Sequence, residues 1–231
     1  MTTLLINLAA PMQSWGDSSR FTERKTRPEP TKSGVLGLLA AALGRRRIDP
    51  IEDLLGLTFG VRTDQPGELT RDFQTAIDWR TGKSKPLSVR YYLADAKFVA
   101  AVEGEDELVS GVAQALRRPT FPLYLGRRSC PPSGPVQTSI TNIALPQALK
   151  EAPWIASSYH RTKQARRVSL PIVRDALPGE PTQETIRDTP ASFDPTDRKY
   201  TWRNVVHDIV QVPNPESESK GYDWLSALGG S

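Results

Sequence analysis

The order of strand-like and helical hydrophobic patterns in the first 132 residues constrains the fold more than any other feature. Short apolar runs predict strands, and apolar residues spaced by three or four predict helices. Thr31 or Ser33 can cap the first helix, and Gly44 can end it. The predicted elements, in chain order, are a strand at 3–9, a helix at 31–44, strands at 57–62 and 96–102, a helix at 105–117 and a strand at 119–125.

This order of strand, helix, strand, strand, helix and strand is that of a ferredoxin-like fold in the α+β class. We therefore predict a ferredoxin-like domain over 1–132, of the RRM kind whose sheet face is a common platform for RNA. A smaller β-rich C-terminal region is expected over 133–212, and 213–231 predicts a flexible tail. Within that region we expect strands at 136–143, 168–174 and 200–212, a helical turn at 147–154 and a basic loop at 156–167.

Residues 66–96 interrupt this order with a polar excursion whose arms, 71–79 and 87–93, are β-like. The arms flank a GKSK segment, which predicts an extended, exposed hairpin. Basic residues alternate there with Trp79, Tyr91 and Tyr92, the composition of a single-stranded RNA contact. A surface hairpin with a packed inner face is the alternative, and it stays open. The candidate contact residues are Arg80, Lys83, Arg90 and Tyr91.

The segment 119–132, PTFPLYLGRRSCPP, joins the last predicted strand to a glycine turn. Gly126 allows the main chain to approach a ligand closely. Arg127, Arg128 and Ser129 add two guanidinium groups and a hydroxyl, and such donors suit a phosphodiester backbone. We expect one arginine to face RNA and the other to brace the turn. An ordinary polar turn with solvated charges explains the same residues.

Two further candidate contacts lie near the N-terminus. Gln13, Ser14 and Trp15 form a turn after Pro11, where Trp15 is expected in the core more readily than as a base-stacking platform. The helix start at Lys32, Ser33 and Gly34 offers free N–H groups and the positive end of the helix dipole, which suit a phosphate. Every helix has such an end, so this signal is weak.

The composition favours a polyanionic partner, because the net charge is +4 and the isoelectric point is about 9.3. The basic residues gather at 20–32 and 161–167. No apolar run is long enough to span a bilayer and no signal peptide precedes the first strand, so we expect a cytoplasmic protein without a membrane partner. A single cysteine, Cys130, fits a reducing compartment.

No catalytic motif emerges. The two histidines, His160 and His207, belong to no recognisable triad or metal motif, and with one cysteine they cannot supply a usual zinc site. His160, beside Arg161 and Lys163, could serve as a general base on an RNA 2′-hydroxyl, but a solvated basic loop is the simpler interpretation. We expect neither a metal, nor a cofactor, nor enzymatic activity.

Four segments resemble the CasD family, the fifth CRISPR-associated protein family of type I-E Cascade, within the RAMP (repeat-associated mysterious protein) superfamily. The resemblance covers most of 3–132, weakens through 133–185 and returns at 186–190 and 200–212. The segments are LLINLAAPMQSWG, PTKSGVLGLLAAALG, SVRYYLADAKFVAAV and PTFPLYLGRRSCP.

This resemblance implies a non-catalytic subunit that grips the 5′ handle of the CRISPR RNA and caps one end of the complex in antiviral defence. The ferredoxin-like domain would be the palm, and 69–96 the thumb that reaches the neighbouring backbone subunit, CasC. The large subunit, CasA, would be another neighbour, and target DNA would be met only indirectly. Arg90 matches the position expected to reach the RNA.

Two other functions stay open. A sister subtype uses its relative to cut precursor RNA, so a metal-independent endoribonuclease that processes CRISPR repeat RNA is the rival. A pure protein scaffold, whose basic patches meet acidic neighbours, is the third.

Overall fold

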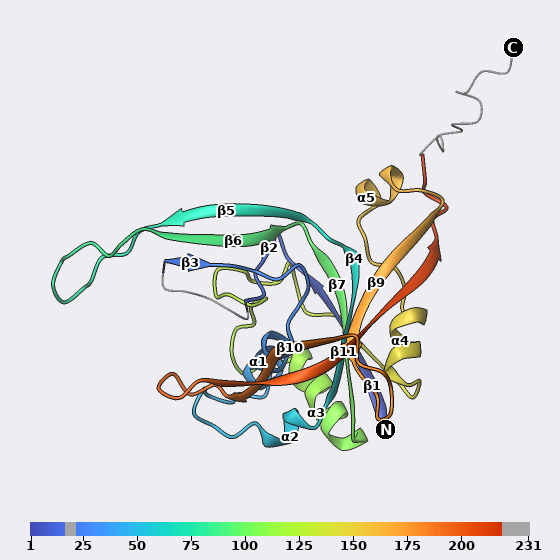
Figure 1. Ribbon diagram of the computed structural model, residues 1–231, viewed down its shortest axis with the longest axis horizontal. Coiled ribbons are helices and arrows are strands. Elements are labelled where there is room, and N and C mark those ends of the chain that lie inside the picture. The colour runs from blue at the N-terminus through green and yellow to red at the C-terminus, as the bar shows by residue number, and fades with distance from the viewer. Residues whose placement is uncertain (17–21, 219–231) are drawn as a thin grey trace, which may run out of the picture.

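A computed structural model describes residues 1–16 and 22–218 of the chain (Figure 1). Its centre is a seven-stranded sheet in the order β10-β11-β9-β4-β7-β1-β8. In the part of the chain that the structure describes, no helix is long and apolar enough to cross a membrane. The sheet strands are β1 (Thr2–Ala9), β4 (Thr58–Gln65), β7 (Lys97–Gly104), β8 (Thr138–Thr141), β9 (Arg167–Asp175), β10 (Glu184–Ser192) and β11 (Lys199–Pro213).

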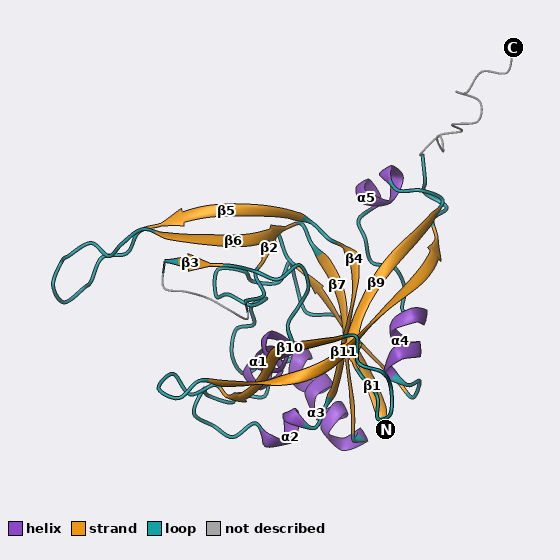
Figure 2. Ribbon diagram, viewed as in Figure 1, coloured by secondary structure: helices purple, strands orange, loops and turns teal. Residues whose placement is uncertain are grey.

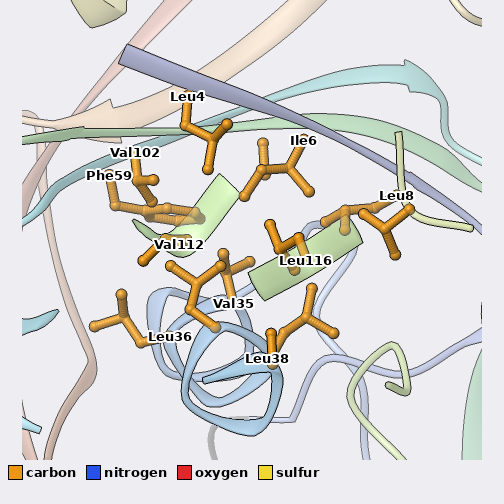
Figure 3. Packing of buried hydrophobic residues seen from close by; sticks show 14 of the residues in the cluster. Leu4, Ile6, Leu8, Val35, Leu36, Leu38, Phe59, Val102, Val112 and Leu116 are labelled. Carbon is orange, nitrogen blue, oxygen red and sulfur yellow. The ribbon is translucent and has the colours of Figure 1, made fainter. Parts of the chain in front are cut away.

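Four neighbouring strands, β4-β7-β1-β8, pair antiparallel throughout. Helices α1 (Lys32–Ala42) and α3 (Asp106–Arg117) pack on one face, and a short α2 (Glu52–Leu55) precedes β4. Thr31 caps α1 by accepting a hydrogen bond from the Gly34 N–H, as predicted. Side chains from the sheet and both helices form one apolar core (Figure 3), which includes Leu4, Ile6, Leu8, Val35, Leu36, Leu38, Phe59, Val102, Val112 and Leu116.

The other face of these strands is covered by α4 (Leu145–Glu151), so the expectation of an open RNA platform there is wrong. Leu145 and Leu149 pack on Leu5, Val99 and Ala101 in a second apolar cluster. In Figure 1, α4 lies on the opposite side of the strands from α1 and α3. The predicted contact residues that can be exposed therefore lie at the hairpin and the loops rather than on this sheet face.

A fully buried ion pair holds α4 in place. Arg62 and Asp64 on β4 have no exposed side-chain surface, and their closest N···O distance is 2.6 Å. The Arg62 guanidinium also donates to the carbonyls of Leu149 (2.6 Å) and Ala152 (2.8 Å), which satisfies the end of α4. Removal of either partner would leave a buried charge uncompensated.

The strand predicted at 119–125 is absent, and β8 takes its place beside β1. Pro119 and Pro122 lack the N–H that a sheet ladder needs. The N–H groups of Thr120 and Phe121 instead donate to the carbonyls of Ala42 and Ala41, at the end of α1. The segment caps a helix, and β8 falls within the β-like 136–143 segment.

The predicted hairpin is formed by β5 (Glu68–Gln74) and β6 (Ser88–Ala94), antiparallel and in register from Glu68↔Ala94 to Gln74↔Ser88. It projects from the body and ends in a long loop (Figure 2). That loop, 75–87, contains one bridge, Ile77↔Ser84, and a turn at Gly82 with φ +67°. Two short strands, β2 (Met12–Gln13) and β3 (Glu23–Arg24), pair with β6 in the same small sheet.

The C-terminal strands continue the main sheet, since β9 pairs with β4. The strands predicted at 168–174 and 200–212 are confirmed as β9 and β11, and α4 overlaps the helical turn predicted at 147–154. The basic segment 156–167 was predicted as a loop, but it contains a short helix, α5 (Ser158–Lys163). Ser157 caps α5 by accepting from the His160 N–H.

Candidate nucleic-acid interface

The glycine turn lies against the N-terminal segment, and only glycine fits there. Gly126 has φ +84°, and a Cβ at this position would lie 1.7 Å from the Ser14 carbonyl oxygen. The turn is closed by the Leu125 N–H, which donates to the Cys130 carbonyl (2.7 Å). The Ser14 N–H in turn donates to the Leu125 carbonyl (3.2 Å). The turn is thereby fixed to residues far away in the sequence.

The turn presents main-chain donors, as predicted, but Gly126 does not supply one of them. The Gly126 N–H donates to the Tyr124 carbonyl (3.2 Å). Within the described residues, the N–H groups of Arg127, Arg128 and Ser129 have no internal acceptor. Successive free amides after a left-handed glycine form a concavity that favours anions.

Arg127 is the arginine that braces the turn. Its guanidinium donates to the carbonyls of Arg24 (2.8 Å) and Lys25 (3.3 Å), and it lies over the buried ring of Tyr92, 4.9 Å from the centroid. One nitrogen, Nη1, is buried and has no hydrogen-bond partner among the described residues. Arg127 is thus held firmly while part of its donor capacity stays unused.

Arg128 and Ser129 are exposed and take no part in this bracing arrangement. Within residues 1–16 and 22–218, no acceptor or acidic group contacts the Arg128 guanidinium. The expected division of labour between the two arginines therefore assigns the bracing to Arg127. Burial raises the pKa of the adjacent Cys130 thiol, which keeps it protonated and a poor nucleophile.

Arg90, on β6, is the second arginine with an unsatisfied donor. It is half-buried, and its Nε has no hydrogen-bond partner in the part of the chain that the structure describes. Asp72 lies directly opposite on β5, and Arg24 lies beside it on β3. No carboxylate of the described residues is within ion-pair distance of Arg90.

Arg90 and Arg127 share one side of the hairpin. Side chains two residues apart on a strand point the same way, so Arg90 lies on the same side as Tyr92, over which Arg127 stacks. Two positive groups, each with a buried and unused N–H, thus lie on one surface. We call Arg90 and Arg127 the arginine pair. An unmade hydrogen bond at a buried donor costs about 1–3 kcal/mol, so an anion that reached both donors would remove both penalties.

The opposite side of the hairpin is apolar and open. Leu69 and Phe73 on β5 are 66% and 51% exposed, and Tyr91 of β6 points to the same side. The loop at the tip adds Ile77 and Trp79, which is 85% exposed. Arg71 lies over Phe73 (4.9 Å) and Arg80 over Trp79 (5.2 Å), so these cations are stacked on rings. Arg80 and Lys83 are exposed in the tip loop.

Comparison with known proteins decides the family. The family described as CRISPR-associated protein (Cas_Cas5) matches residues 3–206. The chain belongs to this CRISPR-associated Cas5 family. It is 35% identical over 165 residues to the CRISPR system Cascade subunit CasD of Escherichia coli (strain K12), which covers 62% of this chain and 73% of that protein.

Solved structures agree with the Cas5 assignment. A crystal structure of a Cas protein is 37% identical, with a TM-score of 0.71 over 93% of this chain and 97% of the other. A chain of a CRISPR RNA-guided surveillance complex is 32% identical, with a TM-score of 0.72 over 98% and 97%. The mixed α/β architecture, dominated by antiparallel sheet, is therefore that of Cas proteins.

In this Cas5 protein, Gln13, Ser14 and Trp15 form a buried framework. Gln13 donates to the carbonyls of Leu8 (3.2 Å) and Ala96 (2.8 Å), and Trp15 donates to Gln13 (3.1 Å). The Trp15 ring has no exposed surface, so the expected core packing is confirmed and Trp15 cannot serve as the RNA contact that was the alternative. Gln13, at 0% exposed, and Ser14, at 1%, offer no surface to RNA either, although the Ser14 carbonyl defines the shape of the glycine turn.

The start of α1 is also internal, which contradicts the predicted phosphate site at Lys32, Ser33 and Gly34. Asp188 of β10 accepts from the Lys32 N–H (2.8 Å), so a carboxylate of the chain already occupies the positive end of the dipole. The Lys32 ammonium pairs with Asp175 (2.8 Å), and Ser33 is only 6% exposed. Gly34 lies against the Trp15 ring, because a Cβ added to Gly34 would be 2.7 Å from that ring.

Arg203 completes this internal network by pairing with both Asp175 (2.8 Å) and Asp188 (2.6 Å). The carboxylates come from β9 and β10, more than 140 positions along the chain, and sequence patterns near Lys32 give no sign of them. Alternation along β6 places Tyr92, rather than the predicted contact residue Tyr91, on the same side of the hairpin as Arg90.

The two histidines lie on other elements. His207 of β11 contacts Glu184 (2.9 Å), and His160 lies on α5, where burial lowers its pKa. Among the described residues, no group of three His, Cys, Asp or Glu side chains is arranged to hold a metal ion. The arrangement at the arginine pair is chemically suited to bind an anion.

Proposed function

We propose that this Cas5 protein is a subunit of a type I-E Cascade surveillance complex that grips the 5′ handle of the CRISPR RNA without cleaving it. The observation that carries the proposal is the arginine pair, with two buried and unused N–H donors on one side of the hairpin. A phosphodiester group accepts hydrogen bonds from several directions and carries the compensating charge. The similarity to the Cascade subunit CasD supports CRISPR RNA as the molecule that supplies this phosphodiester group.

Further donors extend the proposed grip. The free amides at 127–129, the Arg128 guanidinium and the Ser129 hydroxyl form a second phosphate cradle next to Arg127. Arg80 and Lys83 would meet the RNA at the tip of the hairpin, where their exposure makes their contribution sensitive to salt. Base-specific hydrogen bonds would add preference for the handle sequence.

The proposed architecture is a ferredoxin-like RAMP palm with a thumb. The connections β1-α1-β4 and β7-α3-β8 and the antiparallel order β4-β7-β1-β8 support the palm. The projecting β5–β6 hairpin supports the thumb (Figure 1). In this assignment 1–132 supplies most of the palm, and 133–212 forms a β-rich extension that contributes β8. Of the tail predicted at 213–231, residues 219–231 lie outside the described part of the chain, and Asn214 and Ser217 are hydrogen-bonded to the α5 segment.

The apolar side of the hairpin supports a protein neighbour. Exposed Leu69, Phe73 and Trp79 form the type of surface that protein interfaces bury. We assign it to the adjacent backbone subunit of the CasC kind, and we place the large subunit of the CasA kind near the end that the palm caps. Target DNA would be met through the guide. The single buried thiol of Cys130 is compatible with work in the reducing cytoplasm.

The test compares two double variants of equal charge. Arg90→Gln with Arg127→Gln removes the arginine pair, and Arg117→Gln with Arg118→Gln removes two exposed arginines at the end of α3. Each complex is assembled on guide RNA, and RNA release is measured over a series of salt concentrations. We expect the first variant to release the guide at least about tenfold faster, and the second to match the parent.

A parallel incubation of the parent chain with CRISPR repeat RNA in chelator separates binding from processing. Retention of intact RNA is the expected result. Cleavage at a defined site would establish the endoribonuclease instead. Unchanged release from the Arg90/Arg127 variant at every salt concentration would overturn the proposed grip.

A further inference from the structure

A second group of cations lies on α5 and at the start of β9. The proposed function makes no use of these residues. Lys163, Arg166 and Arg167 are exposed, and Tyr159 is 70% exposed beside them. The Lys163 ammonium lies 3.8 Å from the centre of the Tyr159 ring. We call these four residues the α5 ridge. In Figure 1, α5 lies well away from the tip of the hairpin.

The backbone of the α5 ridge is held by hydrogen bonds from residues that follow β11. The Asn214 side chain, from a residue that is 2% exposed, donates to the carbonyls of Arg161 (2.8 Å) and Ala165 (3.0 Å). The Asn214 N–H donates to the Arg166 carbonyl (2.8 Å), and the Ser217 hydroxyl donates to the Gln164 carbonyl (2.7 Å). Binding to a segment that is already ordered costs less conformational entropy.

The charges of the segment divide into satisfied and unsatisfied ones. Arg161 pairs with Glu216 (2.7 Å) and donates to the carbonyls of Trp154 (2.6 Å) and Ala156 (3.0 Å). Glu216 also accepts from Ser158, so it is fully used. Within the described residues, no carboxylate is within ion-pair distance of Lys163, Arg166 or Arg167. In this part of the chain, the Arg166 and Arg167 guanidinium groups thus face solvent without an internal partner, and the Lys163 ammonium contacts only the Tyr159 side chain.

We infer that the α5 ridge is a second binding site for the phosphodiester backbone of nucleic acid, separate from the arginine pair. Its rigid cations match a polyanion, and the exposed Tyr159 ring offers a face on which a base or sugar can pack. Tyr159 is the one large ring exposed among these four residues, so the ridge lacks the apolar centre of a protein interface. This inference goes beyond the proposed function, because it rests on different residues.

The experiment uses the complete guide-loaded complex and two charge-matched variants. Arg166→Gln with Arg167→Gln removes half of the ridge, and Arg117→Gln with Arg118→Gln removes the same charge from α3. Binding to double-stranded DNA that matches the guide is measured over a salt series. We expect the ridge variant to lose roughly tenfold in affinity at low salt and to lower the salt slope by about 2, one for each phosphate contact.

A second arm measures guide release, which distinguishes the two sources of phosphate. Faster guide release at unchanged DNA affinity would assign the ridge to the RNA, and weaker DNA binding at unchanged release would assign it to the DNA. If the ridge variant matches the α3 variant in both arms, the inference is overturned. It is also overturned if the ridge variant loses complex assembly with no change in either salt slope, because an acidic protein surface would then be the partner. Arg90 and Arg127 are intact in these variants, so the result is independent of the proposed grip.

Discussion

The two sides of the β5–β6 hairpin share the same strands and carry opposite chemistry. One side holds the arginine pair and the buried Tyr92 ring, with two donor N–H groups unused. The other side holds Leu69 and Phe73, open to solvent and with an arginine stacked on a ring. Alternation along a strand allows both surfaces from two short segments. The difference is the basis of the proposal that one side binds an anion and the other a protein.

The largest effect is expected from the glycine turn that supports the cationic side. Gly126→Ala introduces a Cβ against the Ser14 carbonyl at a positive φ, so the turn has to move. We expect a loss of at least about 2 kcal/mol of unfolding free energy and strongly reduced guide retention. Urea unfolding measures the first and RNA release the second.

Gly82 provides the matched control for that substitution. It also has a positive φ, +67°, but nothing lies within 4 Å of its added Cβ. Gly82→Ala should therefore cost only about 1 kcal/mol. Equal losses from the two variants would show that contact with Ser14 does not define the turn.

Single arginine variants compare the two sides directly. Arg127→Gln removes a guanidinium with an unused donor, and Arg71→Gln removes one that is stacked on Phe73. We expect about a tenfold loss of guide affinity for the first, as for one charge-assisted hydrogen bond, and less than about a twofold loss for the second. Equal losses would remove the distinction between the sides.

Substitution on the apolar side tests the protein half of the comparison. Leu69→Ser with Phe73→Ser should weaken assembly with the backbone subunit, while unfolding free energy changes little because both side chains are exposed. Co-purification of the complex measures assembly. A lower affinity for guide RNA in the isolated chain would instead place RNA on this side.

The smallest effect on guide affinity is expected from a change of pH. Arginine does not titrate in the usual range, so guide affinity should stay constant between about pH 6 and 9. Away from the hairpin, a hydrogen bond from Arg174 lowers the pKa of Glu180 from 4.5 to about 2. Because this folded-state pKa is depressed, its contribution to stability is present above about pH 4.5 and is lost as the pH falls towards 2.

Thermal unfolding over this acid range tests the prediction. Glu180→Gln should flatten part of the acid dependence of stability and leave guide affinity unchanged. A guide affinity that changes steeply near neutral pH would point to a titrating contact such as His160 instead of the arginine pair.

Local patterns predicted the elements that are themselves local. The strand at 3–9, the helix after Thr31 and the hairpin at 66–96 follow from periodicity, capping and turn residues, which are visible in the local sequence even where the pairing partners, as for β1, lie far along the chain. The strand at 119–125 failed, because its two prolines direct the chain to the end of α1. The expectation of an open RNA face on the sheet was wrong, because α4 covers that face. Helix α4 begins some 40 residues after the end of β7.

The candidate binding residues divide in the same way. Arg90, Arg127 and the glycine turn were predictable, since their chemistry is visible in the sequence. The phosphate site predicted at Lys32 was wrong. The Asp188 carboxylate occupies this helix start, and only tertiary pairing brings Asp188 there. The bracing role of Arg127 likewise depends on carbonyls of Arg24 and Lys25, which the fold brings together from 100 residues away.

A double-mutant cycle tests the central claim most directly, namely that one RNA phosphate satisfies both members of the arginine pair. Guide affinity is measured for the parent, Arg90→Gln, Arg127→Gln and the double variant, all in the assembled complex. A shared phosphate predicts a coupling energy of about 1 kcal/mol or more, with the double variant losing less than the sum of the two single losses. Strictly additive losses, or no loss in any variant, would contradict the account.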